Sequence, residues 1–134
     1  VSFISANFFE WSYLNDKNTN SYQLPQIIKD LKLFSNQHKS QLLIRSIPYK
    51  GGLLNILCHN NKIWGITTPN INFKSRFHGA GDLSTALYAH YINQNISLKK
   101  TLENITGDIF NLLAFKQTKL NRRRVFKAKS LDNL

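Results

Sequence analysis

The feature that most constrains the fold of this chain is the alternation of short apolar runs with segments of helical period. Four runs rich in branched apolar residues are typical of strands, at positions 3–6, 41–47, 53–59 and 62–67. Three segments with apolar residues at helical spacing predict helices, near positions 25–36, 82–93 and 97–115. Strands that alternate with helices predict an α/β fold built around one sheet.

Local turn and cap signals refine this outline. Only Asn60 and Asn61 separate the third and fourth predicted strands, and asparagine tolerates left-handed backbone angles, so we expect a tight antiparallel hairpin there. Residues 48–52 contain a proline and two glycines, which should interrupt the strand pattern. Asn7 is the expected N-cap of a short helix that runs to Leu14, and Ser97 is the expected N-cap of the last helix.

The size and composition of the chain fit one cytoplasmic domain. Its 134 residues, 42% of them hydrophobic, are enough to bury a core. Cys58 is the only cysteine and has apolar neighbours, which predicts a buried thiol in a reducing compartment. The sequence shows no apolar run of about 20 residues and no signal-peptide pattern, so we expect no membrane contact.

The formal net charge of +11 would suit a polyanionic partner. Residues 116–134 contain seven basic residues and one acidic residue, so this basic closing segment carries +6 of the total. The remaining +5 is spread over lysine- and asparagine-rich segments. We therefore expect a solvated basic surface and do not expect nucleic acid as the partner.

A glycine-rich motif, Gly79-Ala80-Gly81-Asp82, leads into the second long predicted helix. Glycines let backbone amides converge on an anion, and the positive end of the helix dipole favours a phosphate. A carboxylate at this position can accept a proton from a substrate. It can equally serve only as the N-cap of the helix, and the motif alone leaves both interpretations open.

A second polar motif, Asn7-Phe8-Phe9-Glu10, directly follows the first predicted strand. Asn7 and Glu10 are one helical turn apart, so their side chains project to the same side and can hold a metal-bound water near phosphates. The alternative interpretation is a capped helix on the surface of the protein.

These two motifs, in this order and separated by a helix, a strand and a hairpin, resemble the layout of ribokinase-like small-molecule kinases. The similarity is greatest to pyridoxal kinases. In that family a segment similar to residues 4–14 follows a strand, and a helix similar to residues 83–93 follows the GxGD motif. Residues 41–47 resemble the strand with a phosphate-contacting lysine, 68–71 the adenosine-side loop, and 122–131 the closing strand region. The resemblance covers essentially the whole chain. It implies the C-terminal part of a three-layer α/β/α fold, with a β-hairpin before the GxGD helix.

The resemblance also implies a reaction, ATP-dependent phosphorylation of the 5′-hydroxyl of pyridoxal in vitamin B6 salvage. Asp82 would be the catalytic base. The backbone amides that would stabilise charge on the transferring phosphoryl group belong to Gly79, Ala80 and Gly81.

The same resemblance implies a nucleotide and metal site. Asn7 and Glu10 would organise the hydration shell of a Mg²⁺ ion that bridges the phosphates of ATP. Arg45 would lie over the phosphates. The residues that would bind the nucleotide are Ser5, Glu10, Arg45, Thr68, Pro69, Asn70 and Ile71.

The sequence departs from the family pattern at three positions. Ala6 replaces a proline, Arg45 replaces a lysine, and His78 precedes the first glycine where a small apolar residue is common. The family's N-terminal half, which carries the pyridoxal pocket, has no counterpart in the sequence. The chain also contains no methionine and starts at Val1, directly on a strand-like run. We therefore expect residues 1–134 to be the C-terminal nucleotide-binding and catalytic half of a kinase domain, incomplete without an N-terminal half or a homodimer partner.

Two other classes of function remain open at this point. One is a degenerate, non-catalytic remnant that serves only in protein association. The other is a basic nucleic-acid-binding domain. Binding to nucleic acid should weaken steeply with added salt, whereas ATP binding at the glycine motif should require Mg²⁺.

Overall fold

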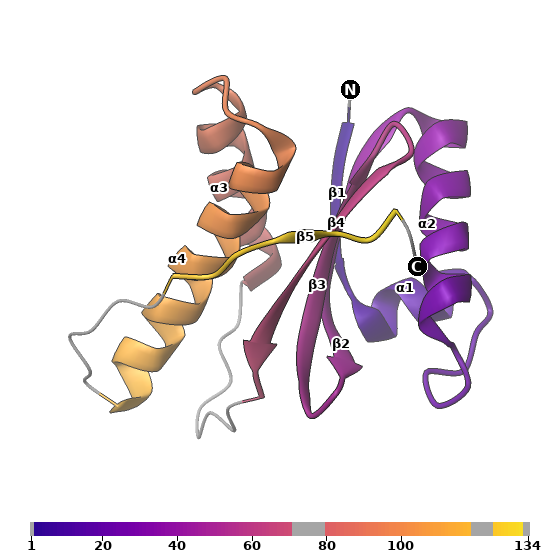
Figure 1. The fold of residues 1–134 in the computed structure, drawn as a ribbon, viewed down its shortest axis with the longest axis horizontal. Coiled ribbons are helices and arrows are strands. Elements are labelled where there is room, and N and C mark those ends of the chain that lie inside the picture. The colour runs from indigo at the N-terminus through magenta and orange to yellow at the C-terminus, as the bar shows by residue number, and fades with distance from the viewer. Residues whose placement is uncertain (1, 71–79, 119–124, 133–134) are drawn as a thin grey trace.

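The structure, a computed structural model, describes residues 2–70, 80–118 and 125–132, without the side chains of residues 80–82 and 113–118. The described residues form one five-stranded sheet and four helices (Figure 1). The strands are β1 (Ser2–Asn7), β2 (Ser40–Tyr49), β3 (Gly52–His59), β4 (Lys62–Pro69) and β5 (Lys129–Ser130). The helices are α1 (Phe8–Leu14), α2 (Leu24–His38), α3 (Ala80–Ile92) and α4 (Leu98–Thr118). The expected α/β fold is confirmed.

The strands lie in the order β1-β2-β3-β4-β5. β1 pairs parallel with β2, with Ser2 opposite Ser40 and Asn7 opposite Arg45, and each later pair is antiparallel. It follows that β1, β2 and β4 run in one direction, and that their carboxyl ends meet at the same edge of the sheet. Polar residues that follow these three strands are therefore brought to one side of the molecule.

Two tight hairpins connect the middle strands. Asn60 and Asn61 form the expected turn between β3 and β4, with φ angles of 50° and 64°. The expected interruption within residues 48–52 is present but shorter than expected, because β2 continues to Tyr49 and only Lys50 and Gly51 form the turn, with φ angles of 48° and 79°.

Pro48 fits inside β2 for a geometric reason. Residues that flank a two-residue turn form a hydrogen-bonded pair, so the nitrogen of the preceding residue points away from the partner strand. The nitrogen of Pro48 therefore points away from β3, toward the side where β1 has already ended at Asn7. A proline at this position removes no hydrogen bond from the ladder.

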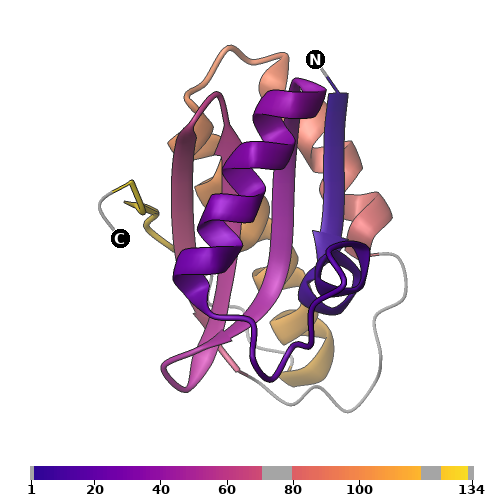
Figure 2. The same cartoon turned by 90° about the vertical axis from the view of Figure 1, so that its right-hand side faces the viewer.

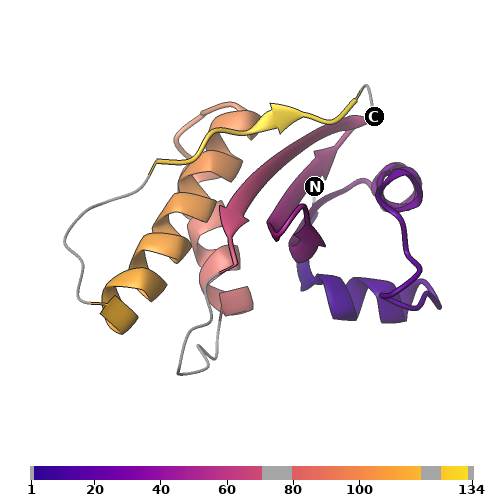
Figure 3. The same ribbon diagram turned by 60° about the horizontal axis from the view of Figure 1, so that its bottom comes forward.

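Helices cover both faces of the sheet and make three layers (Figures 2 and 3). α1 and α2 lie on one face, over a core cluster that includes Trp11, Ile27, Leu31, Ile44, Ile56 and Ile63. α3 and α4 lie on the other face, over a cluster that includes Leu43, Leu57, Ile66, Tyr88, Leu102 and Ile105. Burial of these apolar side chains on both faces is the main term that stabilises the fold.

The helices begin where the sequence indicates. Asn7 caps α1, Pro25 occupies the first turn of α2, and the Ser97 hydroxyl accepts the backbone N–H of Lys100 at the start of α4 at 3.1 Å. Each long helix agrees with its predicted range to within a few residues at either end. No helix in the described part of the chain is long and apolar enough to span a membrane.

Candidate active site

The polar residues at the end of β1 form a reciprocal helix cap. The Asn7 Oδ1 atom accepts the backbone N–H of Glu10 at 2.8 Å, and the Glu10 Oε1 atom accepts the backbone N–H of Asn7 at 2.8 Å. The capped-helix interpretation of this motif is thus confirmed. The cap leaves the Glu10 carboxylate available for a further ligand, because only its Oε1 atom takes part in the cap and the side chain is exposed.

Arg45 lies beside this cap, at the position of β2 opposite Asn7. Its Nε–H donates to the Ser5 Oγ atom at 3.3 Å. Burial of the guanidinium lowers the pKa of Arg45 from its usual value, and the nearby Glu10 carboxylate acts in the opposite direction. The arginine therefore remains a cation, half-buried and close to one carboxylate. The structure brings together Ser5, Asn7, Glu10 and Arg45 at the carboxyl ends of two parallel strands.

The strand alternation fixes the face of the sheet on which Arg45 lies. Leu43 packs into the cluster under α3 and α4, and Phe3 packs against the same cluster. Side chains two residues apart in a strand share a face, so Arg45 and Ser5 lie on the α3 side of the sheet. The guanidinium is therefore on the same face as the helix that begins with the glycine motif.

The start of α3 lies at the edge of the sheet where β1 ends (Figure 1). The Phe3 and Tyr88 rings stack with centroids 3.8 Å apart, which sets the level of the helix against the strand. From Tyr88 back to Ala80 the helix spans about 12 Å, and from Phe3 forward to Asn7 the strand spans about 13 Å. The N-terminus of α3 is therefore level with Asn7, which supports a shared site.

Several predicted site residues fall at the limit of the described chain. Ala80 is the first residue of α3, and Gly81 and Asp82 follow in its first turn, where only the backbone is described. Gly79, Ile71 and His78 lie outside the described residues. The predicted position of the Asp82 carboxylate near Glu10 stays a prediction.

Thr68 and Pro69, at the end of β4, are not gathered with Arg45. They pair with Leu53 and Gly52 of β3, which in turn pair with the end of β2 beyond Arg45. Thr68 is two residues from Ile66 in the strand and shares the α4 side of the sheet with it, whereas Pro69 points to the α2 side. Asn70 is exposed and follows the strand. These residues could border an elongated ligand only at some distance from Arg45.

A β-bulge that sequence reasoning missed lies next to Arg45. The register of β2 against β3 shifts between Ile44 and Ile47, and Ser46 has a φ of 67°. The Ser46 backbone N–H donates to the Asn55 Oδ1 atom at 3.0 Å, which holds the bulge in place. Bulges often re-aim a side chain beside a functional site. Neither serine nor asparagine at these positions gives a signal in the sequence alone.

The residues present suit a hydrated Mg²⁺ better than a metal cage. No cluster of three or more His, Cys, Asp or Glu side chains suited to a metal occurs in the part of the chain that the structure describes. Mg²⁺ usually keeps several waters and takes only one or two carboxylates together with substrate phosphates. The exposed Glu10 carboxylate, with the Asn7 amide beside it, fits that requirement.

The sequence matches no protein-family model and no curated protein. Its fold, in contrast, matches solved kinase structures. A putative phosphomethylpyrimidine kinase from Bacteroides thetaiotaomicron, in a crystal form with pyridoxal, has a TM-score of 0.73 at 19% identity, over 98% of this chain and 53% of that chain.

Two pyridoxal kinases match over similar lengths. The enzyme from Staphylococcus aureus, in complex with ADP, has a TM-score of 0.73 at 13% identity, over 98% of this chain and 53% of that one. The enzyme from Entamoeba histolytica has a TM-score of 0.69 at 19% identity, over 98% of this chain and 51% of that one. The chain therefore spans about half the length of these structures. It has the fold of the C-terminal half of ribokinase-like kinases, represented by pyridoxal and phosphomethylpyrimidine kinases.

Proposed function

We propose that this chain is the nucleotide-binding and catalytic half of a pyridoxal kinase-like phosphotransferase. The observation that carries the proposal is the gathering of Ser5, Asn7, Glu10 and Arg45 at the carboxyl edge of β1 and β2, with α3 beginning at the same edge. Ligands of open α/β sheets bind at this edge. The kinase fold of the neighbours supports the assignment to phosphoryl transfer from ATP.

Each residue of the site has a distinct task in this proposal. Arg45 binds the phosphates of ATP as a fixed cation, and Ser5 orients its guanidinium. The backbone amides at the start of α3 stabilise negative charge on the transferring phosphoryl group. Asp82, in the first turn of that helix, accepts the proton of the attacking hydroxyl.

Mg²⁺ would be held through Glu10 and Asn7 as a hydrated ion. A bound Mg²⁺ ion would neutralise negative charge on the phosphates. Asn7 has a structural task as well, because its side chain caps α1 and so holds Glu10 at the edge of the sheet.

The acceptor alcohol in this proposal is pyridoxal or a related B6 vitamer, and its pocket belongs to a half of the kinase fold that this chain does not supply. Two exposed features beside the site support a missing partner. β1 is an edge strand of the described sheet and pairs only with β2. Phe9, Tyr13 and Leu14 of α1 are large apolar side chains that remain exposed. A further half of the domain, or a partner chain, would cover them.

Without that half, binding should survive better than catalysis. In-line transfer requires the hydroxyl, Asp82 and the γ-phosphate to be held together, and such positioning can supply about 7–11 kcal/mol of a barrier. The isolated chain should therefore form pyridoxal 5′-phosphate very slowly or not at all. It should still bind Mg²⁺-ATP weakly.

The test is an absorbance assay for pyridoxal 5′-phosphate, with the chain alone and with the N-terminal half of a pyridoxal kinase added. We expect turnover only in the mixture, and we expect Asp82→Asn to abolish it while ATP binding remains. Robust turnover by the chain alone would contradict the assignment of the acceptor pocket to another polypeptide. Turnover in the mixture that Asp82→Asn leaves unchanged would contradict the assignment of the base.

A further inference from the structure

A cavity of about 520 Å³ lies on the α2 side of the sheet, away from Arg45. Its lining includes three apolar side chains, Leu24, Leu54 and Leu131. The other lining residues come from the end of β2, the turn after it, β4 and the C-terminal segment around β5. Cavities of this volume match the usual size of small-molecule sites.

Three lysines line this cavity, namely Lys50, Lys127 and Lys129, and no acidic residue is among its described lining residues. The ion pairs of the described chain join Asp132 and Glu103 to other lysines, Lys32, Lys99 and Lys100. The three cavity lysines take part in none of these ion pairs and present positive charge to the cavity. An anion is the complementary ligand.

The direction of two of these lysines follows from the strand alternation at the C-terminus. Ala128 packs into the cluster under α4, and its N–H donates to the buried Glu103 Oε2 atom at 2.8 Å. Leu131 packs on the opposite face and donates its backbone N–H to the Ile63 carbonyl at 2.9 Å. Lys127 and Lys129 alternate with Ala128 and so share the cavity side with Leu131. Contacts at both ends of this segment thus fix the backbone that carries both lysines (Figure 3).

Lys50 occupies the first position of the β2–β3 turn in a left-handed conformation, with φ of 48°. Left-handed geometry is unfavourable for lysine by about 1–2 kcal/mol. The other hairpin of the same sheet uses Asn60 and Asn61, which are residues suited to such a turn. Local strain of this kind tends to accompany a functional demand. Here the turn places a cation at the rim of the cavity.

We propose that this cavity binds a small phosphorylated compound with a flat apolar ring. The phosphate would contact the ammonium groups of Lys50, Lys127 and Lys129, and the ring would rest on Leu24 and Leu54. The Tyr49 ring, which the Lys50 ammonium approaches to 5.2 Å from the centroid, offers an aromatic face at the same rim.

Thr68 and Pro69, which the family resemblance assigned to the nucleotide site, also line this cavity, but the proposed phosphate-binding residues Arg45 and Ser5 do not. Arg45 and Ser5 lie on the α3 side of the sheet, whereas Gly65, Thr67 and Pro69 of β4 face the cavity on the α2 side. The proposal therefore does not rest on the kinase function, and a bound phosphate here would act as a second ligand.

The composition of the cavity lining favours a small molecule over nucleic acid. A nucleic acid strand needs a continuous basic groove with stacking side chains along it. The cavity lining instead combines three lysines with apolar side chains. Because nucleic acid would bind through overall charge, it should respond equally to lysines at any position on the surface.

The test is NMR titration of the full chain with phenyl phosphate, AMP and tripolyphosphate, in EDTA so that the Mg²⁺-dependent site is silent. We expect phenyl phosphate and AMP to shift the amide signals of Gly52 and Gly65, and tripolyphosphate, which lacks a ring, to bind more weakly. Comparison of phenyl phosphate with AMP distinguishes a simple aryl phosphate from a nucleotide as the ligand.

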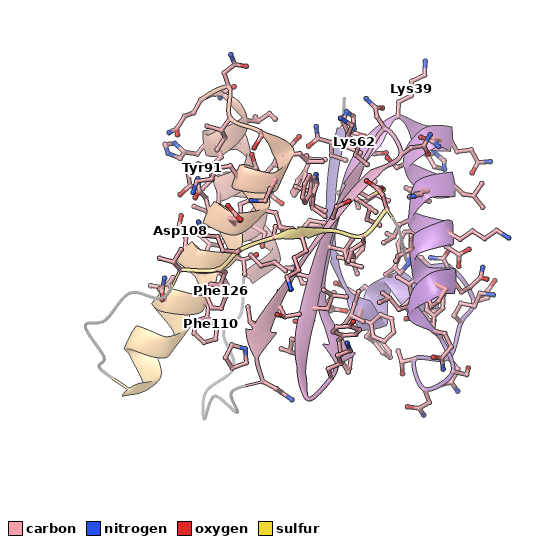
Figure 4. All side chains as sticks on the ribbon, in the orientation of Figure 1. Lys39, Lys62, Tyr91, Asp108, Phe110 and Phe126 are labelled. Carbon is pink, nitrogen blue, oxygen red and sulfur yellow. The ribbon has the colours of Figure 1, made fainter. Side chains whose placement is uncertain are left out.

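The variant Lys127→Glu/Lys129→Glu should weaken binding by roughly tenfold or more, since two charge-assisted contacts are lost. The matched control is Lys39→Glu/Lys62→Glu, which changes the net charge equally at the opposite end of the sheet (Figure 4). We expect the control to change affinity less than about twofold. Lys50→Asn should weaken binding while stabilising the fold, because asparagine relieves the left-handed strain.

Three results would overturn the proposal. The first is an absence of amide shifts with all three probes up to about 10 mM, well above the millimolar affinity of a weak site. The second is an equal loss of affinity in both double variants. The third is tighter binding of a single-stranded RNA than of any probe, weakened equally by both double variants, which would assign the charge to a nucleic-acid surface.

Discussion

Arg45 donates its Nε–H to the Ser5 hydroxyl at 3.3 Å, across the parallel pair of β1 and β2. This contact ties the carboxyl ends of two strands together on the face of the sheet that α3 covers. The strands lie far apart in the sequence, so only the fold brings the two side chains into contact. The cation is thereby held at the edge where α1 and α3 both begin.

The helix cap at the end of β1 predicts a stability effect. Asn7→Ala removes the acceptor for the Glu10 backbone N–H and should lower the free energy of unfolding by about 0.5–2 kcal/mol. Asn7→Asp keeps an acceptor at the same position and should change it much less. Urea denaturation monitored by circular dichroism measures both values. Equal stability of the wild type and Asn7→Ala would show that the cap contributes nothing.

The close packing of Leu131 against Gly65 should make the fold sensitive to a larger residue at position 65. A Cβ atom at this position would lie 2.7 Å from Leu131 Cδ1, so Gly65→Ala should destabilise the fold by about 1–3 kcal/mol. Leu131→Ala removes the atom in conflict, and the double variant should therefore lose less stability than the sum of the two single variants. Thermal or urea unfolding of the four proteins gives the coupling. Strict additivity would contradict the packing of Leu131 over Gly65.

The buried thiol of Cys58 should make the stability of the fold decrease at alkaline pH. Burial raises the pKa of its thiol to about 11. In the unfolded chain the thiol ionises near its ordinary pKa of about 8.5, so stability should fall between about pH 9 and 11, by up to about 1.4 kcal/mol per pH unit. The measurement is the urea midpoint against pH for the wild type and Cys58→Ala. Because the lysines and tyrosines of both proteins titrate alike, the difference between the two curves isolates the thiol, and parallel curves would contradict its burial.

The same burial predicts a slow reaction of Cys58 with thiol reagents. The thiolate is the reactive form, and the native chain keeps the thiol protonated and covered at pH 8. We expect a disulfide reagent to modify the unfolded chain in urea rapidly and the native chain slowly, at a rate set by unfolding. Equally fast modification of both states would be inconsistent with the described core.

The sequence predicted most of the fold because its signals are local. Asn60-Asn61 marked one hairpin, and Asn7 and Ser97 marked two helix starts, through side-chain chemistry that acts over a few residues. The second hairpin was missed because lysine is not a residue that favours left-handed angles. Pro48 suggested a break in the strand because proline lacks an N–H. It is tolerated inside β2 because β1 ends before it, and sequence alone does not show where β1 ends.

The site could be predicted only in part from the sequence. The motif around Asn7 and Glu10 was found, and its two side chains do lie together. The contact of Arg45 with Ser5 depends on the parallel register, and the bulge held by Asn55 depends on a register shift, so neither has a local signal. The distance along the sheet between Arg45 and Pro69 likewise follows from strand pairing, which sequence alone does not give.

The central claim is that this chain carries the ATP-binding half of a kinase site. Isothermal titration calorimetry of the isolated chain with ATP, in the presence and absence of Mg²⁺, tests it most directly. The account predicts weak binding that requires Mg²⁺, a loss of roughly tenfold in affinity for Arg45→Ala, the size expected for one charge-assisted phosphate contact, and a smaller loss for Arg45→Lys. The absence of any Mg²⁺-dependent heat at millimolar ATP, or binding that Arg45→Ala leaves unchanged, would contradict it.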